Sequence, residues 1–177
     1  MTVSDKIFNN IKIHTQYSIC EGAIKIDELA EHCKSNKITS IGLADSYNLC
    51  GALEFSEKLS KVGTQPIIGT QINLRVHNVV GKITLYATSE QGYKNLTKLS
   101  SLSYLKKKEI DEPSCEISDL ISNNEDLILL TGNYYNGLIE YEDMMFLLHS
   151  MRPHNVFIDI GANAGIYSIL SSKVIGC

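Results

Sequence analysis

The chain has 177 residues, a hydrophobic fraction of 44% and a formal net charge of −4 at pH 7. This length allows one domain and part of a second, and the negative charge argues against direct nucleic-acid binding, which needs clustered Lys and Arg. The sequence has no apolar run long enough to span a bilayer and no secretory apolar core, so we expect a cytoplasmic protein that does not bind membranes.

The first predicted element is a short strand at 11–14, where apolar and polar residues alternate. A helix is expected at 25–35, because its apolar residues recur at helical spacing. These residues are Ile26, Leu29, Ala30 and Cys33. The segment 39–45 is apolar enough to predict a strand that is buried on both faces.

A second helix is predicted at 51–62, and Gly63 stands where the end of a helix is expected. The apolar points of this helix are Leu53, Phe55 and Leu59. Strands are predicted at 66–74 and 81–88, and we interpret the second as a hairpin partner of the first.

Further along, the pattern predicts a long helix at 90–105, a short helix at 117–121 and a strand at 126–131. A loop follows, and an amphipathic helix is expected at 139–151. The alternation of strands and helices predicts an α/β layer or barrel fold with a largely parallel sheet.

Polar residues stand at or near the carboxyl ends of three predicted strands, namely His14, Asp45 and Gln71. Ligands bind at this edge in barrels and in open α/β sheets. His14 and Asp45 are candidate metal ligands, although zinc sites usually have about three or more protein ligands. The alternative is a polar cluster that hydrogen bonds hold together without a metal.

The runs at 8–18, 43–55, 65–69, 91–96 and 126–132 resemble, in this order, the N-terminal PHP domain of bacterial DNA polymerase III alpha subunits (polymerase and histidinol phosphatase). The resemblance covers residues 5–137, about the first half of such a domain, and implies a partial PHP-type (β/α) barrel. It implies a nucleotidyltransferase family that works in DNA replication. Because no polymerase module is recognisable, we expect no polymerase activity from this chain by itself.

The chain departs from the family at the expected metal ligands. Lys12 replaces the first His of a His-x-His pair that ends in His14. Ser46 replaces a His after Asp45, and Gln71 replaces an acidic residue. A positive charge at Lys12 disfavours a bound cation. We therefore expect a degenerate, empty metal cluster at His14 and Asp45 and no catalytic residues. The remaining role would be a scaffold that docks the proofreading exonuclease subunit.

The last segment carries a different motif, in which an apolar strand at 156–160 enters a glycine turn and a helix. Residues 138–177 resemble the start of FkbM-type methyltransferases that use S-adenosylmethionine. The resemblance implies that Asp159, Gly161, Asn163 and Gly165 would line the methionine part of that cofactor. An ordinary strand–turn–helix unit is the alternative. We expect no cofactor binding, because S-adenosylmethionine would need a complete methyltransferase domain.

The sequence thus predicts an α/β protein with a partial PHP domain at 1–137 and a truncated Rossmann-like methyltransferase strand–helix unit at 138–177. The favoured interpretation is the PHP scaffold of a replication protein. The alternatives are a fragment of an FkbM-type methyltransferase and a non-functional remnant of two fused genes.

Overall fold

The computed structural model describes residues 9–76, 79–106, 112–130 and 157–158. Within them, one six-stranded sheet has the order β1-β2-β3-β5-β6, and β4 pairs with β2 off this path. The strands are β1 (Ser40–Ser46), β2 (Gln65–Val76), β3 (Val79–Ala87), β4 (Ser114–Glu116), β5 (Leu127–Leu130) and β6 (Phe157–Ile158). The helices are α1 (Ile26–Ser35), α2 (Ala52–Lys61), α3 (Glu90–Leu105) and α4 (Ile117–Ser122).

The sheet is mixed, so the prediction of a largely parallel sheet is wrong for the described strands. β1 and β4 run parallel to β2, and β6 runs parallel to β5, but β3 is antiparallel to both β2 and β5. The short connection at 77–78 explains the β2–β3 pairing, because a parallel partner would need a much longer crossover. The hairpin predicted for this pair is confirmed.

The strand expected at 11–14 is reduced to a single bridge between Ile13 and Leu43. Its backbone still follows β1, since Ile13 donates to the Gly42 carbonyl and accepts from the Ala44 amide. β4 has no counterpart among the predicted strands. It pairs with Asn73–Arg75 of β2, just past the point where β1 ends.

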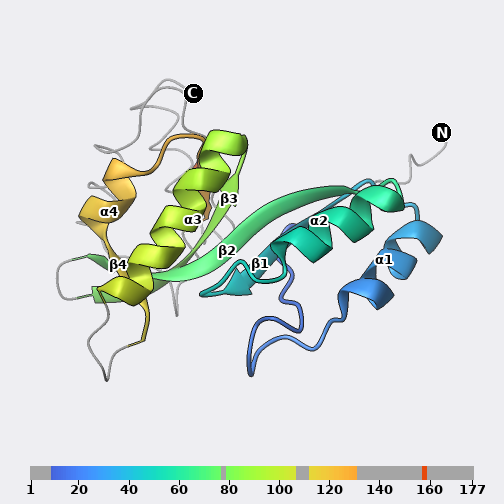
Figure 1. Ribbon diagram of the computed structural model, residues 1–177, viewed down its shortest axis with the longest axis horizontal. Helices are drawn as coiled ribbons and strands as arrows, with labels where there is room; N and C mark the ends of the chain where they lie inside the picture. The colour runs from blue at the N-terminus through green and yellow to red at the C-terminus, as the bar shows by residue number, and fades with distance from the viewer. Residues whose placement is uncertain (1–8, 77–78, 107–111, 131–156, 159–177) are drawn as a thin grey trace, which may run out of the picture.

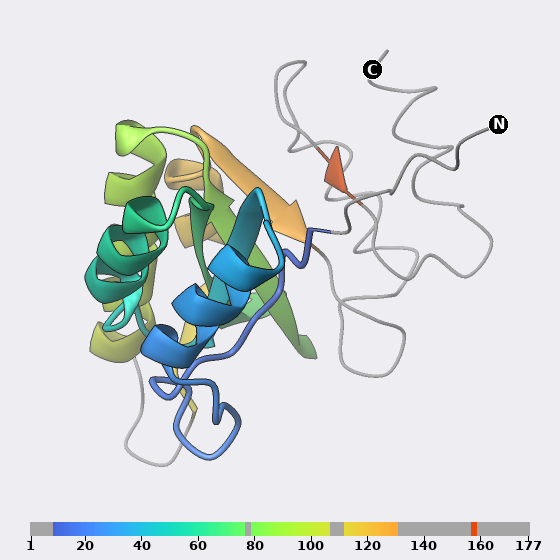
Figure 2. The same cartoon turned by 90° about the vertical axis from the view of Figure 1, so that its right-hand side faces the viewer.

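Two helices lie side by side on one face of the sheet, α2 over β2 and α3 over β2 and β3 (Figures 1 and 2). The predicted apolar face of α1 is confirmed, because all four of its residues are buried. On α2, however, Leu53 is 80% exposed, whereas Phe55 is fully buried. Of the apolar points named from the sequence, Leu53 is therefore not part of the core, because Ala52, rather than Leu53, shares a helical face with Phe55 and Leu59.

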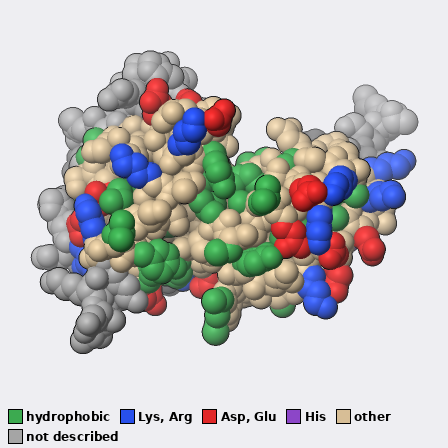
Figure 3. Space-filling model, viewed as in Figure 1, with side chains coloured by type: hydrophobic (Ala, Val, Ile, Leu, Met, Phe, Trp, Pro, Cys, Tyr) green, Lys and Arg blue, Asp and Glu red, His purple; other side chains and the backbone are tan. Residues whose placement is uncertain are grey.

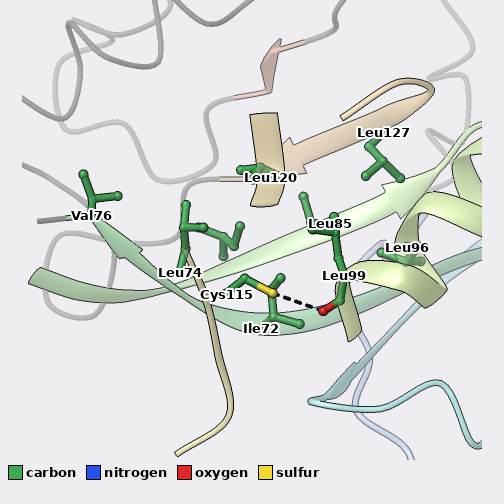
Figure 4. Close-up of a cluster of buried hydrophobic side chains, with 10 residues drawn as sticks. Ile72, Leu74, Val76, Leu85, Leu96, Leu99, Cys115, Leu120 and Leu127 are labelled. Atoms are coloured by element: carbon green, nitrogen blue, oxygen red, sulfur yellow. Dashed lines mark hydrogen bonds between the residues drawn. The ribbon is translucent and has the colours of Figure 1, made fainter. Parts of the chain in front are cut away.

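One of the two large hydrophobic clusters lies between β2, β3 and α3 and is closed by α4 (Figure 4). Alternate residues of β2, such as Ile72 and Leu74, point into it and are fully buried. The Cys115 thiol of β4 also lies in this cluster and donates to the Leu99 carbonyl of α3 at 3.1 Å. Gln71 and Asn73 alternate with Ile72 and Leu74 along β2, so they face the opposite side of the sheet.

None of the helices in the described part of the chain is both long and apolar enough to cross a membrane. The strand expected at 156–160 is seen at Phe157–Ile158, where it pairs with β5 in the same sheet as the other strands. The helix expected at 139–151 and the predicted domain boundary at 137 lie outside the described residues.

Candidate functional site: a hydrogen-bonded carboxylate at the end of β1

Asp45, the last residue but one of β1, is completely buried. Its Oδ1 accepts hydrogen bonds from the Thr15 amide at 2.6 Å and the Ser18 hydroxyl at 2.9 Å. Its Oδ2 accepts from the Thr15 hydroxyl at 2.6 Å. Both carboxylate oxygens are therefore engaged by donors of the loop that follows the Ile13 bridge, and hydrogen bonds of this charge-assisted kind are strong.

Gly51 allows this loop to pack closely against the start of α2. A Cβ atom at this position would lie 2.7 Å from the Tyr17 ring and 3.2 Å from Asp45 Oδ2. Such approaches are closer than carbon atoms tolerate, so a side chain at residue 51 would push the loop away from Asp45.

His14 is held beside this network through Ser18. The Ser18 hydroxyl donates its single hydrogen to Asp45 and accepts from the Ser46 amide at 2.9 Å. His14 Nδ1 lies 3.3 Å from the same oxygen, so it must be the donor of that pair. The neutral ring therefore carries its hydrogen on Nδ1.

The pKa of His14 is lowered from its ordinary value, first by burial and then by the positive charge of Lys12. An unfolded His takes up a proton near pH 6.5, whereas native His14 resists it. The contribution of neutral His14 to the free energy of unfolding should therefore be fully present above about pH 6.5. It should be lost as the pH drops toward the depressed native pKa.

Urea denaturation of the wild type and His14→Gln, from about pH 7.5 down to pH 5, measures this contribution. The difference in free energy between the two proteins should change across this window, because only the wild type loses the His14 contribution on acidification. A pH-independent difference would contradict the assignment.

A second set of contacts starts at Ser46, on the other side of the strand end. The Ser46 hydroxyl donates to Glu21 Oε2, and the Lys82 ammonium of β3 lies 3.1 Å from Glu21 Oε1. The hydrogen bond from Ser46 is the main cause of the lowered pKa of Glu21, and Lys82 adds to it. Glu21 is therefore an ion-paired carboxylate at neutral pH.

Tyr47 directly follows β1 and has a backbone φ of +63°, which is uncommon for a residue other than Gly. Its amide donates to the Gln71 carbonyl at 2.8 Å, and its hydroxyl oxygen lies 3.2 Å from Asn73 Oδ1 and 3.1 Å from Glu112 Oε2, either of which can accept its hydrogen. The Lys82 ammonium lies 5.7 Å from the centre of its ring, within reach of a cation–π interaction.

The structure brings His14 and Asp45 together, as predicted, but as members of a hydrogen-bonded cluster. Across the described residues, no group of three or more His, Cys, Asp or Glu side chains is placed to hold a metal ion. Asp45 has both oxygens engaged, and Gln71 is a neutral, buried side chain. These residues do not fit a divalent cation, which requires several free anionic or imidazole ligands.

Sequence reasoning missed most of the side chains that hold this site, namely Thr15, Ser18, Glu21, Tyr47, Asn73 and Lys82. Thr15, Ser18 and Glu21 lie within or next to the first PHP-like run, which was a usable signal. Lys82 carried no signal, because its ion pair with Glu21 spans 61 positions in the sequence. The residues predicted to line a methionine pocket, Asp159, Gly161, Asn163 and Gly165, lie outside the described residues.

Comparison with known proteins identifies the family that this chain matches. Residues 10–149 match the PHP domain family. Similar curated proteins are the DNA polymerase III subunits alpha of Caulobacter vibrioides and Rickettsia felis, which are 38% and 39% identical over 138 and 136 residues. The matches cover 71% and 75% of this chain but only 12% and 11% of those proteins. The chain therefore spans a small part of its relatives' length.

Among solved structures, a chain from Bifidobacterium adolescentis, provisionally assigned as a metal-dependent phosphoesterase, matches with a TM-score of 0.64. The two sequences are 13% identical, and the match covers 95% of this chain and 84% of that one. At this identity the likeness shows a shared fold and nothing about activity.

Proposed function

Because this chain belongs to the PHP domain family, we propose that it is a metal-free PHP domain that acts as a protein-binding scaffold in DNA replication. The observation that carries the proposal is the engagement of both Asp45 oxygens by Thr15 and Ser18. Three donors occupy three of the roughly four lone-pair positions of the carboxylate, so little acceptor capacity remains for a metal ion.

The charges around Asp45 support the same proposal. Lys12 lowers the pKa of His14, and Lys82 pairs with Glu21, so two positive charges lie close to the candidate ligands. Ser46 uses its hydroxyl on Glu21. Phosphoester hydrolysis by metal-bound water requires the metal to lower the pKa of that water.

Metal content and hydrolysis together test the absence of a catalytic metal. We expect purified protein to contain substoichiometric zinc and manganese and to leave bis(p-nitrophenyl) phosphate intact, with or without added Mn²⁺. His14→Ala is the control, since it removes the one imidazole of the cluster. Stoichiometric metal or turnover that this substitution abolishes would refute the proposal.

The scaffold role rests on the similarity to DNA polymerase III subunits alpha and on the surface. The face in Figure 3 shows acidic and basic side chains interspersed, without the basic stripe that phosphate binding requires. Several large apolar side chains are exposed on the described surface and are available for contact with a partner. They include Ile19, Leu53, Tyr104 and Leu105.

By its resemblance, the partner we propose is the proofreading exonuclease subunit of DNA polymerase III. Calorimetric titration of this chain with that subunit tests the assignment, and saturable binding is expected. The negative control is the same titration with an unrelated α/β protein of similar charge in place of this chain. Absence of binding, at concentrations where a full alpha subunit binds the exonuclease, would contradict the scaffold role.

A further inference from the structure

We propose that the Lys82 ammonium supplies, at this edge of the sheet, the positive charge that a divalent metal ion would otherwise supply. The inference rests on the proposed metal-free function and deepens it, because it names the residue that keeps cations out. It concerns a side chain for which the family resemblance implies no role.

The position of Lys82 follows from the register of the sheet. Lys82 of β3 pairs with Asn73 of β2, so both face the side opposite the large hydrophobic cluster. From there the ammonium reaches Glu21 at 3.1 Å and lies over the Tyr47 ring. The Lys82 side chain is 35% exposed and that of Glu21 is 37% exposed, so the pair is partly withdrawn from water.

Carboxylates lie close to the Lys82 ammonium, and its positive charge stabilises their ionised forms. Hydrogen bonds from Ser46 and Asn73 are the main causes of the lowered pKa values of Glu21 and Glu112, respectively, and the charge of Lys82 lowers both further. Asp45 lies one residue before Ser46 on β1. Glu21 and Glu112 repel each other, and the positive charge of Lys82 offsets this repulsion.

One ammonium links segments that are far apart in the sequence. Through Glu21 it is joined to Ser46 at the end of β1, and through Tyr47 to Asn73 and Glu112. A divalent ion held by ligands from different strands would join the same segments. With Lys82 present, such an ion would meet a like charge a few ångströms away, which lowers its affinity.

The test replaces Lys82 by Met, which keeps the aliphatic stem and removes the charge. We expect Lys82→Met to bind Mn²⁺ on the order of tenfold more tightly than the wild type, since one nearby like charge has gone. Free Mn²⁺ is counted by electron paramagnetic resonance, and the melting temperature of the variant should rise with added Mn²⁺. The matched control is Lys94→Met. Lys94 pairs with Glu90 at 2.7 Å, and both side chains are exposed on the surface of α3.

A second pair of variants guards against misfolding and against binding elsewhere. Lys82→Gln keeps an N–H donor for Glu21 while removing the charge, and it should show the same gain of Mn²⁺ affinity. Adding Glu21→Gln to Lys82→Met should abolish the gain. Mn²⁺ affinity equal to that of the wild type in both single variants, or a gain that survives Glu21→Gln, would overturn the inference. Stoichiometric metal in the wild type would instead refute the proposed function, so the two failures are distinguishable.

Discussion

Asp45→Asn should lower the free energy of unfolding by about 3 kcal/mol, because hydrogen bonds to a buried charge are worth roughly twice those between neutral groups. The substitution keeps the shape of the side chain but turns one acceptor oxygen into an N–H donor. That donor would meet either the Thr15 amide and the Ser18 hydroxyl, which now donate to Oδ1, or the Thr15 hydroxyl, which now donates to Oδ2. Chemical denaturation followed by circular dichroism measures the loss.

The result also discriminates between the two interpretations of the cluster. Removing one carboxylate from an empty metal site relieves repulsion and tends to stabilise the fold, whereas removing a satisfied buried carboxylate destabilises it. Asp27→Asn is the matched control. Asp27 is 76% exposed and pairs with Lys58, so its loss should cost less than about 1 kcal/mol. Equal stability of wild type and Asp45→Asn would argue for a metal site.

Phe55→Ala is expected to cost about 4 kcal/mol, in the range found for aromatic side chains removed from protein cores. Phe55 is fully buried under α2, in the cluster that α1, α2 and β1 share. The cavity left behind would lie between two helices and the sheet, which cannot all move inward together. The midpoint and slope of urea denaturation give the change in free energy.

Leu53→Ala on the same helix supplies the control. Leu53 is 80% exposed, so the shortened side chain loses little burial and gains helix propensity. We expect a change within about 0.5 kcal/mol of zero. A loss comparable to that of Phe55→Ala would mean that Leu53 is buried in solution, either in the fold or in an assembly.

This pair of residues illustrates what composition and periodicity can predict. The helix itself was predicted within one residue at each end, because apolar residues recur at helical spacing and Gly63 follows with a φ of +82°. The pattern named Leu53 and Leu59 together as apolar points and did not show which of the two is buried. Both candidates are equally apolar, and only the packing of α2 on β2 selects the face that carries Ala52, Phe55 and Leu59.

The sequence also predicted the neighbourhood of His14 and Asp45, but not its chemistry. Strand ends in an α/β fold bring such residues to one edge, so their proximity follows from the order of elements. The donors that occupy Asp45 come from a loop about 30 positions earlier, and their hydrogen-bond directions depend on how that loop turns. The departures at Lys12, Ser46 and Gln71 predicted a degenerate site, but they did not show which donors engage Asp45.

By itself, the sequence determined the helices, the main strands and the PHP family, because these depend on local periodicity and on runs of neighbouring residues. The tertiary structure alone decided the mixed sheet, the pairing of β4 with β2 and the place of Lys82. Each depends on the register between strands, and a shift of one residue would move Lys82 to the hydrophobic face. Register is settled by the packing of the whole sheet against its helices, so it is not encoded in any single segment.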